Sequence, residues 1–110
     1  MNWISLTAPA QLDTLVERSR TKPQVIFKHS TRCSISSTAK NRLETARQSD
    51  AVDFYYLDLI AFRDISNRVA EQFRVPHASP QVLIIRDGQC IFDESHLGIR
   101  MDDILEQAVA

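Results

Sequence analysis

Three short apolar runs alternate with segments of helical periodicity, and this alternation constrains the fold more than any other feature. The runs are Gln24–His29, Asp53–Asp58 and Gln81–Ile85. Each has the length and the β-branched or aromatic content of a strand. The intervening segments carry apolar residues three and four positions apart, which is typical of amphipathic helices. Because helices that join strands usually make right-handed crossovers between parallel neighbours, we expect an α/β fold.

The last two strands form a predicted hairpin. Asp87-Gly88 follows the third run and is a strong two-residue turn signal, because such turns favour residues that tolerate positive φ. Cys90–Phe92 then continues as a fourth, antiparallel strand. With one helix before the first strand and one after the last, the order is α-β-α-β-α-β-β-α. We predict a mixed four-stranded sheet with helices on both faces, in a single domain over residues 1–110.

Composition excludes several classes of function. A net charge of -1 gives no electrostatic basis for binding nucleic acid or an anionic membrane. No apolar run approaches the length of a membrane span, and Met1–Ser5 lacks the basic start of a signal peptide. The two cysteines and three histidines show no metal-ligand spacing. We expect a cytoplasmic monomer without a bound metal, in which thiols stay reduced.

Cys33 is the residue most suited to chemistry. It stands between the first strand and a helix, inside Ser30–Ser37, a segment rich in helix-capping residues. A helix N-terminus offers unpaired N–H groups and a partial positive charge, which favour the thiolate, the nucleophilic form of cysteine. Neighbouring Arg32 and Lys28 add positive charge. Ser34, Ser36 and Ser37 are candidates to cap the helix or to donate hydrogen bonds to the sulfur. We interpret Cys33 as a reactive thiol.

The order of elements resembles the thioredoxin fold over nearly the whole chain. In that fold the reactive cysteine opens the helix after the first core strand, where Cys33 lies. The segment Ser30-Thr31-Arg32-Cys33-Ser34-Ile35-Ser36-Ser37 resembles, more narrowly, the signature of the monothiol bacilliredoxins, the redox-active proteins of the bacillithiol system. Their usual motif is Cys-Pro-Ile-Ser, from which this chain departs at Ser34. The resemblance also implies a cis Ser79–Pro80 bond facing Cys33, with the Ser79 backbone able to pair with substrate.

The missing second thiol determines the predicted mechanism. Ser36 occupies the position of the second cysteine of dithiol proteins, and its hydroxyl cannot form a disulfide. Cys90 follows the hairpin turn, which at about 3.3 Å per residue puts it roughly 20 Å from Cys33. A disulfide needs Cα atoms within about 7 Å, so we interpret Cys90 as a packing residue.

We therefore hypothesise a monothiol thiol–disulfide oxidoreductase that frees S-thiolated client proteins from a low-molecular-weight thiol. The resemblance suggests bacillithiol as this thiol, acting as a co-substrate; no tightly bound cofactor is expected. The candidate catalytic residues are Cys33, Ser36 and Pro80. The candidate small-thiol contacts are Arg32, Ser34 and Ser79, and Lys28 and Arg100 are further cations that suit its malate carboxylates.

Two alternatives stay open at this point. A monothiol glutaredoxin-like carrier would hold an iron–sulfur cluster through Cys33 and glutathione, although Gly88 and Gly98 stand apart and form no Gly-Gly pair. A binding module would keep the fold without redox work. His29 ends the strand that leads into the Cys33 loop, and His96 falls near the returning end of the fourth strand. We interpret both as surface or boundary residues rather than catalytic bases.

Overall fold

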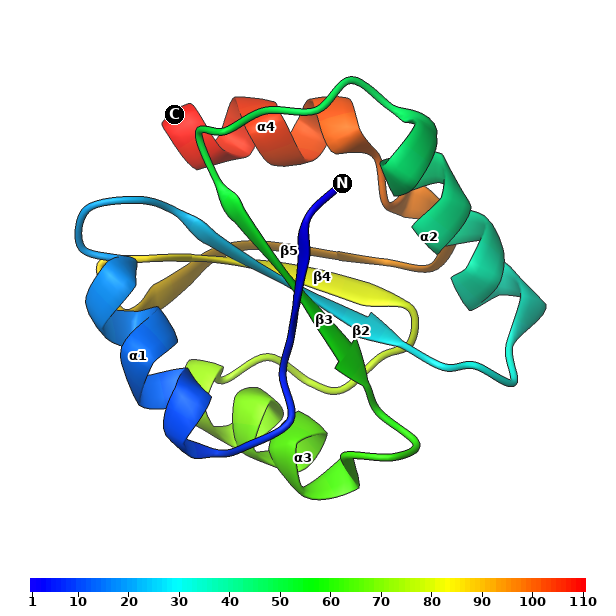
Figure 1. Ribbon diagram of the computed structural model, residues 1–110, viewed down its shortest axis with the longest axis horizontal. Helices are drawn as coiled ribbons and strands as arrows, with labels where there is room; N and C mark the ends of the chain where they lie inside the picture. Colours follow the sequence, from blue (N-terminus) through cyan, green and yellow to red (C-terminus); the bar gives the residue numbers. More distant parts are fainter.

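In the computed structural model, which describes residues 1–110, one sheet lies between two layers of helices (Figure 1). The strands are β1 (Trp3–Ser5), β2 (Gln24–His29), β3 (Asp53–Asp58), β4 (Gln81–Arg86) and β5 (Gln89–Ser95). The helices are α1 (Ala10–Arg18), α2 (Ser34–Thr45), α3 (Arg63–Phe73) and α4 (Met101–Val109), with a 3-10 turn, η1 (His96–Gly98), before α4.

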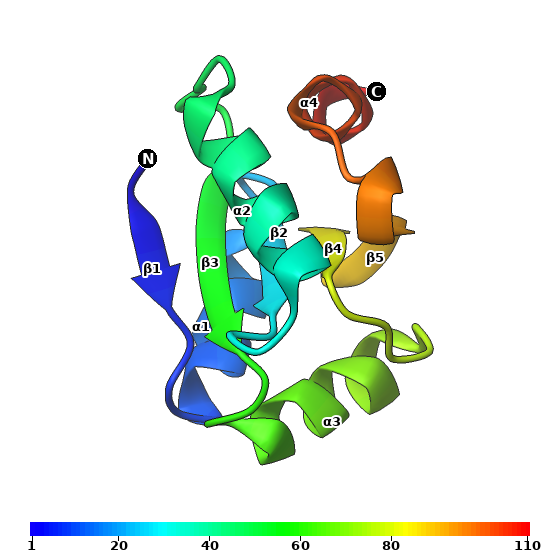
Figure 2. The same ribbon diagram turned by 90° about the vertical axis from the view of Figure 1, so that its right-hand side faces the viewer.

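The sheet has five strands in the order β1-β3-β2-β4-β5. β1, β3 and β2 are parallel, whereas β4 runs antiparallel to β2 and β5 antiparallel to β4. The expected mixed sheet is confirmed, but the expected number of four strands is wrong. The additional strand is β1, whose Trp3 pairs with Phe54 at the edge of the sheet (Figure 2). It has only three residues, too few to show the alternation by which a strand is recognised in sequence.

Helices cover both faces of the sheet, as expected. α2 and α4 lie on one face, and α1 and α3 lie on the other (Figure 1). Because side chains alternate along a strand, β2 serves both layers. Phe27 packs into the core under α2 and α4, whereas Ile26 packs into the core under α1 and α3. Each such fully buried side chain stabilises the fold by roughly 1.5–3 kcal/mol.

The hairpin between β4 and β5 fixes which residues meet Cys33. Asp87 and Gly88 have φ values of 53° and 76°, so the expected turn is present. The strand pairing sets Gln81 opposite Lys28, close to the end of β2. The residues just before β4 therefore lie at the same end of the central strands as the loop that follows β2.

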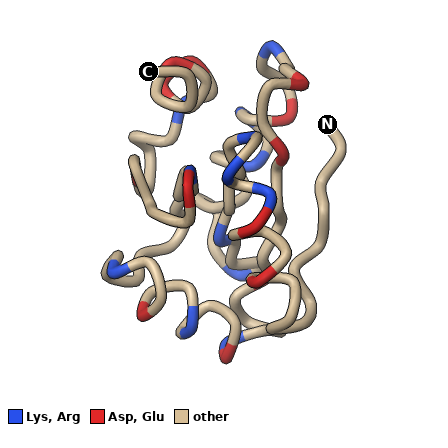
Figure 3. Tube along the Cα trace, turned by 90° about the vertical axis from the view of Figure 1, so that its left-hand side faces the viewer, with Lys and Arg blue, Asp and Glu red and all other residues tan.

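Charged side chains are spread over the molecule rather than segregated. Basic and acidic residues are interspersed along the trace in the view of Figure 3. None of the helices combines the length and the apolar character needed to cross a lipid bilayer.

Candidate active site

Cys33 is the N-cap residue of α2 and is partly exposed. Its carbonyl accepts the N–H of Ser37 at 3.1 Å, so the helix begins directly at the thiol-bearing residue. The N–H groups of Ser34, Ile35 and Ser36 donate no hydrogen bond within the protein, and the first turn has no acidic residue. These groups form the positive end of the helix dipole, which favours an anion at the helix start.

Ser36 joins the start of α2 to the end of β2. Its side chain is fully buried, and its Oγ accepts the N–H of Ser30 at 3.0 Å. The same oxygen lies 2.7 Å from His29 Nδ1. Because the hydroxyl has one proton to give, the consistent arrangement has Ser36 donating to Nδ1 of a neutral His29 ring. Ser36 therefore holds the loop around Cys33 through both of its hydrogen bonds.

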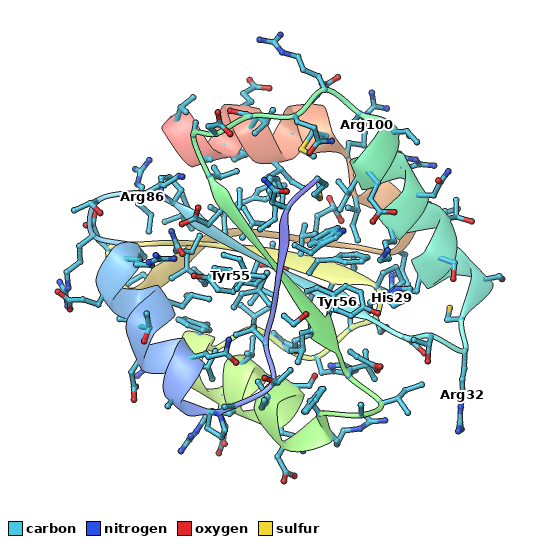
Figure 4. All side chains as sticks on the ribbon, in the orientation of Figure 1. His29, Arg32, Tyr55, Tyr56, Arg86 and Arg100 are labelled. Atoms are coloured by element: carbon cyan, nitrogen blue, oxygen red, sulfur yellow. The ribbon has the colours of Figure 1, made fainter.

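His29 is buried, with 5% of its surface exposed, so its interpretation as a surface or boundary residue is wrong. Figure 4 shows His29 beside Tyr56. The centroid of the His29 ring lies 5.5 Å from that of Tyr56 and 5.8 Å from that of Phe27. Burial lowers the pKa of His29, and the charge of Lys40 lowers it further. These effects favour the neutral ring that accepts from Ser36. His96, in contrast, is exposed, as expected.

Pro80 lies at the start of β4, at the same end of the central strands as the Cys33 loop. It is buried, and the Ser79–Pro80 peptide bond is cis, as the resemblance implied. The carbonyl of Pro80 accepts the N–H of His96 at 2.9 Å. On either side of Pro80, Ser79 Oγ and Gln81 Oε1 are buried without a hydrogen-bond partner. The Ser79 hydroxyl is therefore enclosed by the protein and unpaired, rather than open to a ligand.

The three cations considered for the small thiol do not converge on Cys33. Arg32 is exposed and its side chain extends away from the protein, whereas Arg100 lies at the far end of α2 (Figure 4). There Arg100 and Arg42 line a shallow hollow of about 540 Å³. Lys28 is fully buried. Of these three, only Arg32 remains beside Cys33, next to the exposed Ser34.

Cys90 is half-buried on β5, beside the hairpin turn and opposite Ile85. It packs against the core under α1 and α3, and its thiol lies 3.3 Å from the carbonyl of Phe92. Burial raises the pKa of Cys90. Pro80 and the Cys33 loop lie at the opposite end of the hairpin, so the two cysteines are at opposite ends of the strands. Both cysteines are free thiols, and the placement of Cys90 agrees with a packing role.

Comparison with known proteins identifies the family. The model of the monothiol bacilliredoxin BrxC matches residues 4–104. The chain belongs to the monothiol bacilliredoxin family. It is a thiol redox protein with a thioredoxin-like oxidoreductase fold, as its sequence predicted.

Solved structures agree with this assignment. A thioredoxin-fold protein described as a candidate oxidoreductase is 27% identical, with a TM-score of 0.83 over 94% of this chain and 91% of the other. Thioredoxin from Malassezia sympodialis is 18% identical, with a TM-score of 0.77 over 99% and 92% of the two chains. Thioredoxin from Fasciola hepatica is 20% identical, with a TM-score of 0.71 over 96% and 95%. The two thioredoxins share the fold with this bacilliredoxin.

Proposed function

We propose that the protein removes bacillithiol from S-thiolated client proteins in the cytoplasm, with Cys33 as its one working thiol. The observation that carries this proposal is the position of Cys33, partly exposed at a helix start with unpaired N–H groups around it. Membership of the monothiol bacilliredoxin family supports bacillithiol as the small thiol. The distant, half-buried Cys90 supports a cycle without an internal disulfide.

The cycle consists of two thiol–disulfide exchanges. The Cys33 thiolate attacks the bacillithiol sulfur of the mixed disulfide, so that a Cys33–bacillithiol disulfide forms and the client thiolate leaves and is protonated by solvent. The thiolate of a second bacillithiol then attacks the bacillithiol sulfur on Cys33. This step releases Cys33 and forms bacillithiol disulfide. The net reaction converts one mixed disulfide and one free bacillithiol into one client thiol and one bacillithiol disulfide.

Residues around Cys33 have distinct parts in this proposal. Ser36 holds the loop through His29 and Ser30 rather than resolving a disulfide. The backbone N–H and C=O of Ser79 make no backbone hydrogen bond within the protein, and they are available to an extended client segment. Arg32 and Ser34 are exposed and are available to the small thiol, whereas the Ser79 hydroxyl is buried, so Ser79 contributes through its backbone groups.

Intact-mass spectrometry tests the proposal directly. The reduced protein is mixed in turn with the disulfides of bacillithiol, glutathione and coenzyme A. We expect a single adduct, formed fastest with bacillithiol, in the wild type and in the matched control Cys90→Ser, and none in Cys33→Ser. Absence of any adduct in the wild type, or equal adduct in Cys33→Ser, contradicts the monothiol cycle. A faster adduct with glutathione or coenzyme A contradicts bacillithiol as the small thiol.

A further inference from the structure

Lys28 is a buried amine without an acidic partner. Its side chain is fully buried on β2, and the ion pairs of the protein involve Arg20, Lys22 and Lys40 instead. Its Nζ has two contacts, the carbonyl of Ser66 at 3.3 Å and His77 Nδ1 at 3.4 Å. Burial lowers the pKa of Lys28 to about 8. An apolar side chain of the same length would avoid this desolvation penalty. The amine of Lys28 therefore does not serve the stability of the fold, and we infer another role for it.

The contacts of Lys28 lead to the loop that precedes Pro80. Residues 76–79 make no backbone-to-backbone hydrogen bond, so their position depends on side chains. Lys28 contacts His77, and Gln81 Nε2 donates to the carbonyl of Pro76 at 3.1 Å. Lys28 and Gln81 stand opposite each other in the pairing of β2 with β4. This cross-strand pair thus contacts the segment at two points, the carbonyl of Pro76 and the ring of His77.

His77 receives this contact as an acceptor. Partial burial of its ring and the charges of Lys28 and Arg63 lower the pKa of His77, so the ring is neutral near pH 7. Its Nδ1 then accepts a hydrogen bond from the Lys28 ammonium, and Ser66 Oγ lies 3.5 Å from the same nitrogen. The ammonium therefore connects β2, α3 and the loop before Pro80.

We propose that Lys28, with Gln81, is a positioning residue that holds residues 76–79 as the edge on which an extended segment of the S-thiolated client docks beside Cys33. The inference rests on the proposed function and adds to it the side chains that position the client-binding segment. Lys28 points to the face of the sheet that α3 covers, whereas α2 and Cys33 lie on the other face. Lys28 therefore acts on the binding of the client rather than on the sulfur of Cys33.

Two reactions of Cys33 separate these effects. Alkylation by iodoacetamide requires only the thiolate, whereas exchange with a bacillithiol-modified peptide also requires the docking edge. For Lys28→Met we expect KM for the peptide to rise about tenfold, the effect of losing one hydrogen bond to a charged group. We expect kcat and the iodoacetamide rate to stay within about twofold of the wild type. Lys22→Met, which changes a partly exposed lysine two residues before β2, is the matched control and should leave all three unchanged.

Two His77 variants keep the test independent of the Lys28 substitution. His77→Asn retains an acceptor near the position of Nδ1 and should keep a KM close to that of the wild type, whereas His77→Leu should raise KM as Lys28→Met does. Equal KM values in the wild type, Lys28→Met and His77→Leu overturn the inference while the proposed function stands. A parallel fall in the iodoacetamide rate also overturns it, because Lys28 would then act on the thiol. A wild type that leaves both S-bacillithiolated and S-glutathionylated peptides intact refutes the proposed function and the inference together.

Discussion

Lys28 and His29 are adjacent on β2 and both are buried, but they face opposite sides of the sheet and differ in how they are satisfied. His29 has a short hydrogen bond to Ser36 and two aromatic neighbours. Lys28 has two long contacts and no counter-ion. On the His29 side, the contacts stabilise both the fold and the start of α2. On the Lys28 side, a buried charge weakens the fold and positions a loop.

The difference indicates that the two segments next to Cys33, helix α2 and the loop before Pro80, are held in place by separate sets of contacts. Helix α2 is fixed from the His29 face by the Ser36 hydroxyl, which hydrogen-bonds both the N–H of Ser30 and the ring of His29. The loop before Pro80 is fixed from the Lys28 face by side chains that reach out from the sheet. Substitutions on the two sides should therefore change stability in opposite directions.

The largest effect is expected from Lys28→Met. Because burial lowers the pKa of Lys28 from 10.5 to about 8, the unfolded chain binds more protons than the folded one between these pH values. Stability of the wild type therefore rises across this window, and below it the charged amine destabilises the fold by roughly 3 kcal/mol. Lys28→Met should be more stable by up to that amount at pH 7, with the advantage fading towards pH 10.5. Urea unfolding at pH 7, 8.5 and 10 measures the difference; a less stable variant at pH 7 would show that the Lys28 contacts outweigh its burial.

A change of opposite sign is expected from Ser36→Ala. The variant leaves the N–H of Ser30 and Nδ1 of His29 without their partner. Leaving such groups unpaired costs about 2 kcal/mol of unfolding free energy. Ser37→Ala, at the next and exposed position of the same helix, is the control and should change stability by less than about 0.5 kcal/mol. Equal urea midpoints for the two variants would contradict the bridging role of Ser36.

Acid should lower the free energy of unfolding through both His29 and His77, and the loss should be larger for His29. Burial lowers the pKa of His29 and of His77, so the unfolded chain binds protons first as pH falls. Stability from these residues is complete above the unfolded pKa of about 6.5 and is lost as pH falls below it. His29→Asn, which keeps an acceptor for Ser36, should flatten the decline between pH 7.5 and 5 more than His77→Asn, because His29 is the more buried. Thermal unfolding across this range checks the order of the two variants, and the reverse order would refute it.

Much of the fold could be predicted from local patterns. The Gln24–His29 and Asp53–Asp58 runs coincide with β2 and β3, and Asp87-Gly88 makes the predicted turn. β1 was missed because three residues at a sheet edge carry no periodicity. Its place depends on Phe54 and Tyr55, which lie about fifty positions away and offer a partner only after folding.

In the candidate site, too, features with a local sequence signal could be predicted, whereas those that depend on tertiary packing could not. Cys33 was found because a capping segment before a helical pattern is a local signal, and its position at the start of α2 is confirmed. The link between Ser36 and His29 was missed, because hydrogen bonds between a strand and the next helix depend on how the two pack. Lys28 is the one lysine in the Gln24–His29 run, which signals a buried charge but not its partners. Its partners Ser66 and His77 come from distant segments, so the sequence alone does not reveal them.

The smallest effect on stability is expected from Lys40→Gln. This variant tests whether a charge on α2 changes the pKa of His29. Lys40 pairs with Glu44 at 2.8 Å, lies over the ring of Tyr56, and lowers the pKa of His29 through its charge. Removing the charge should raise the pKa of His29 while changing stability by less than about 0.5 kcal/mol, because a single i,i+4 pair near the surface contributes little. Titration of the His29 ring by NMR, with Lys22→Met as the control, measures this shift. His77 lies across the sheet and titrates beside Lys28, so its pKa should stay unchanged in Lys40→Gln; a shift of both rings would mean that the two sides of the sheet are coupled rather than separate.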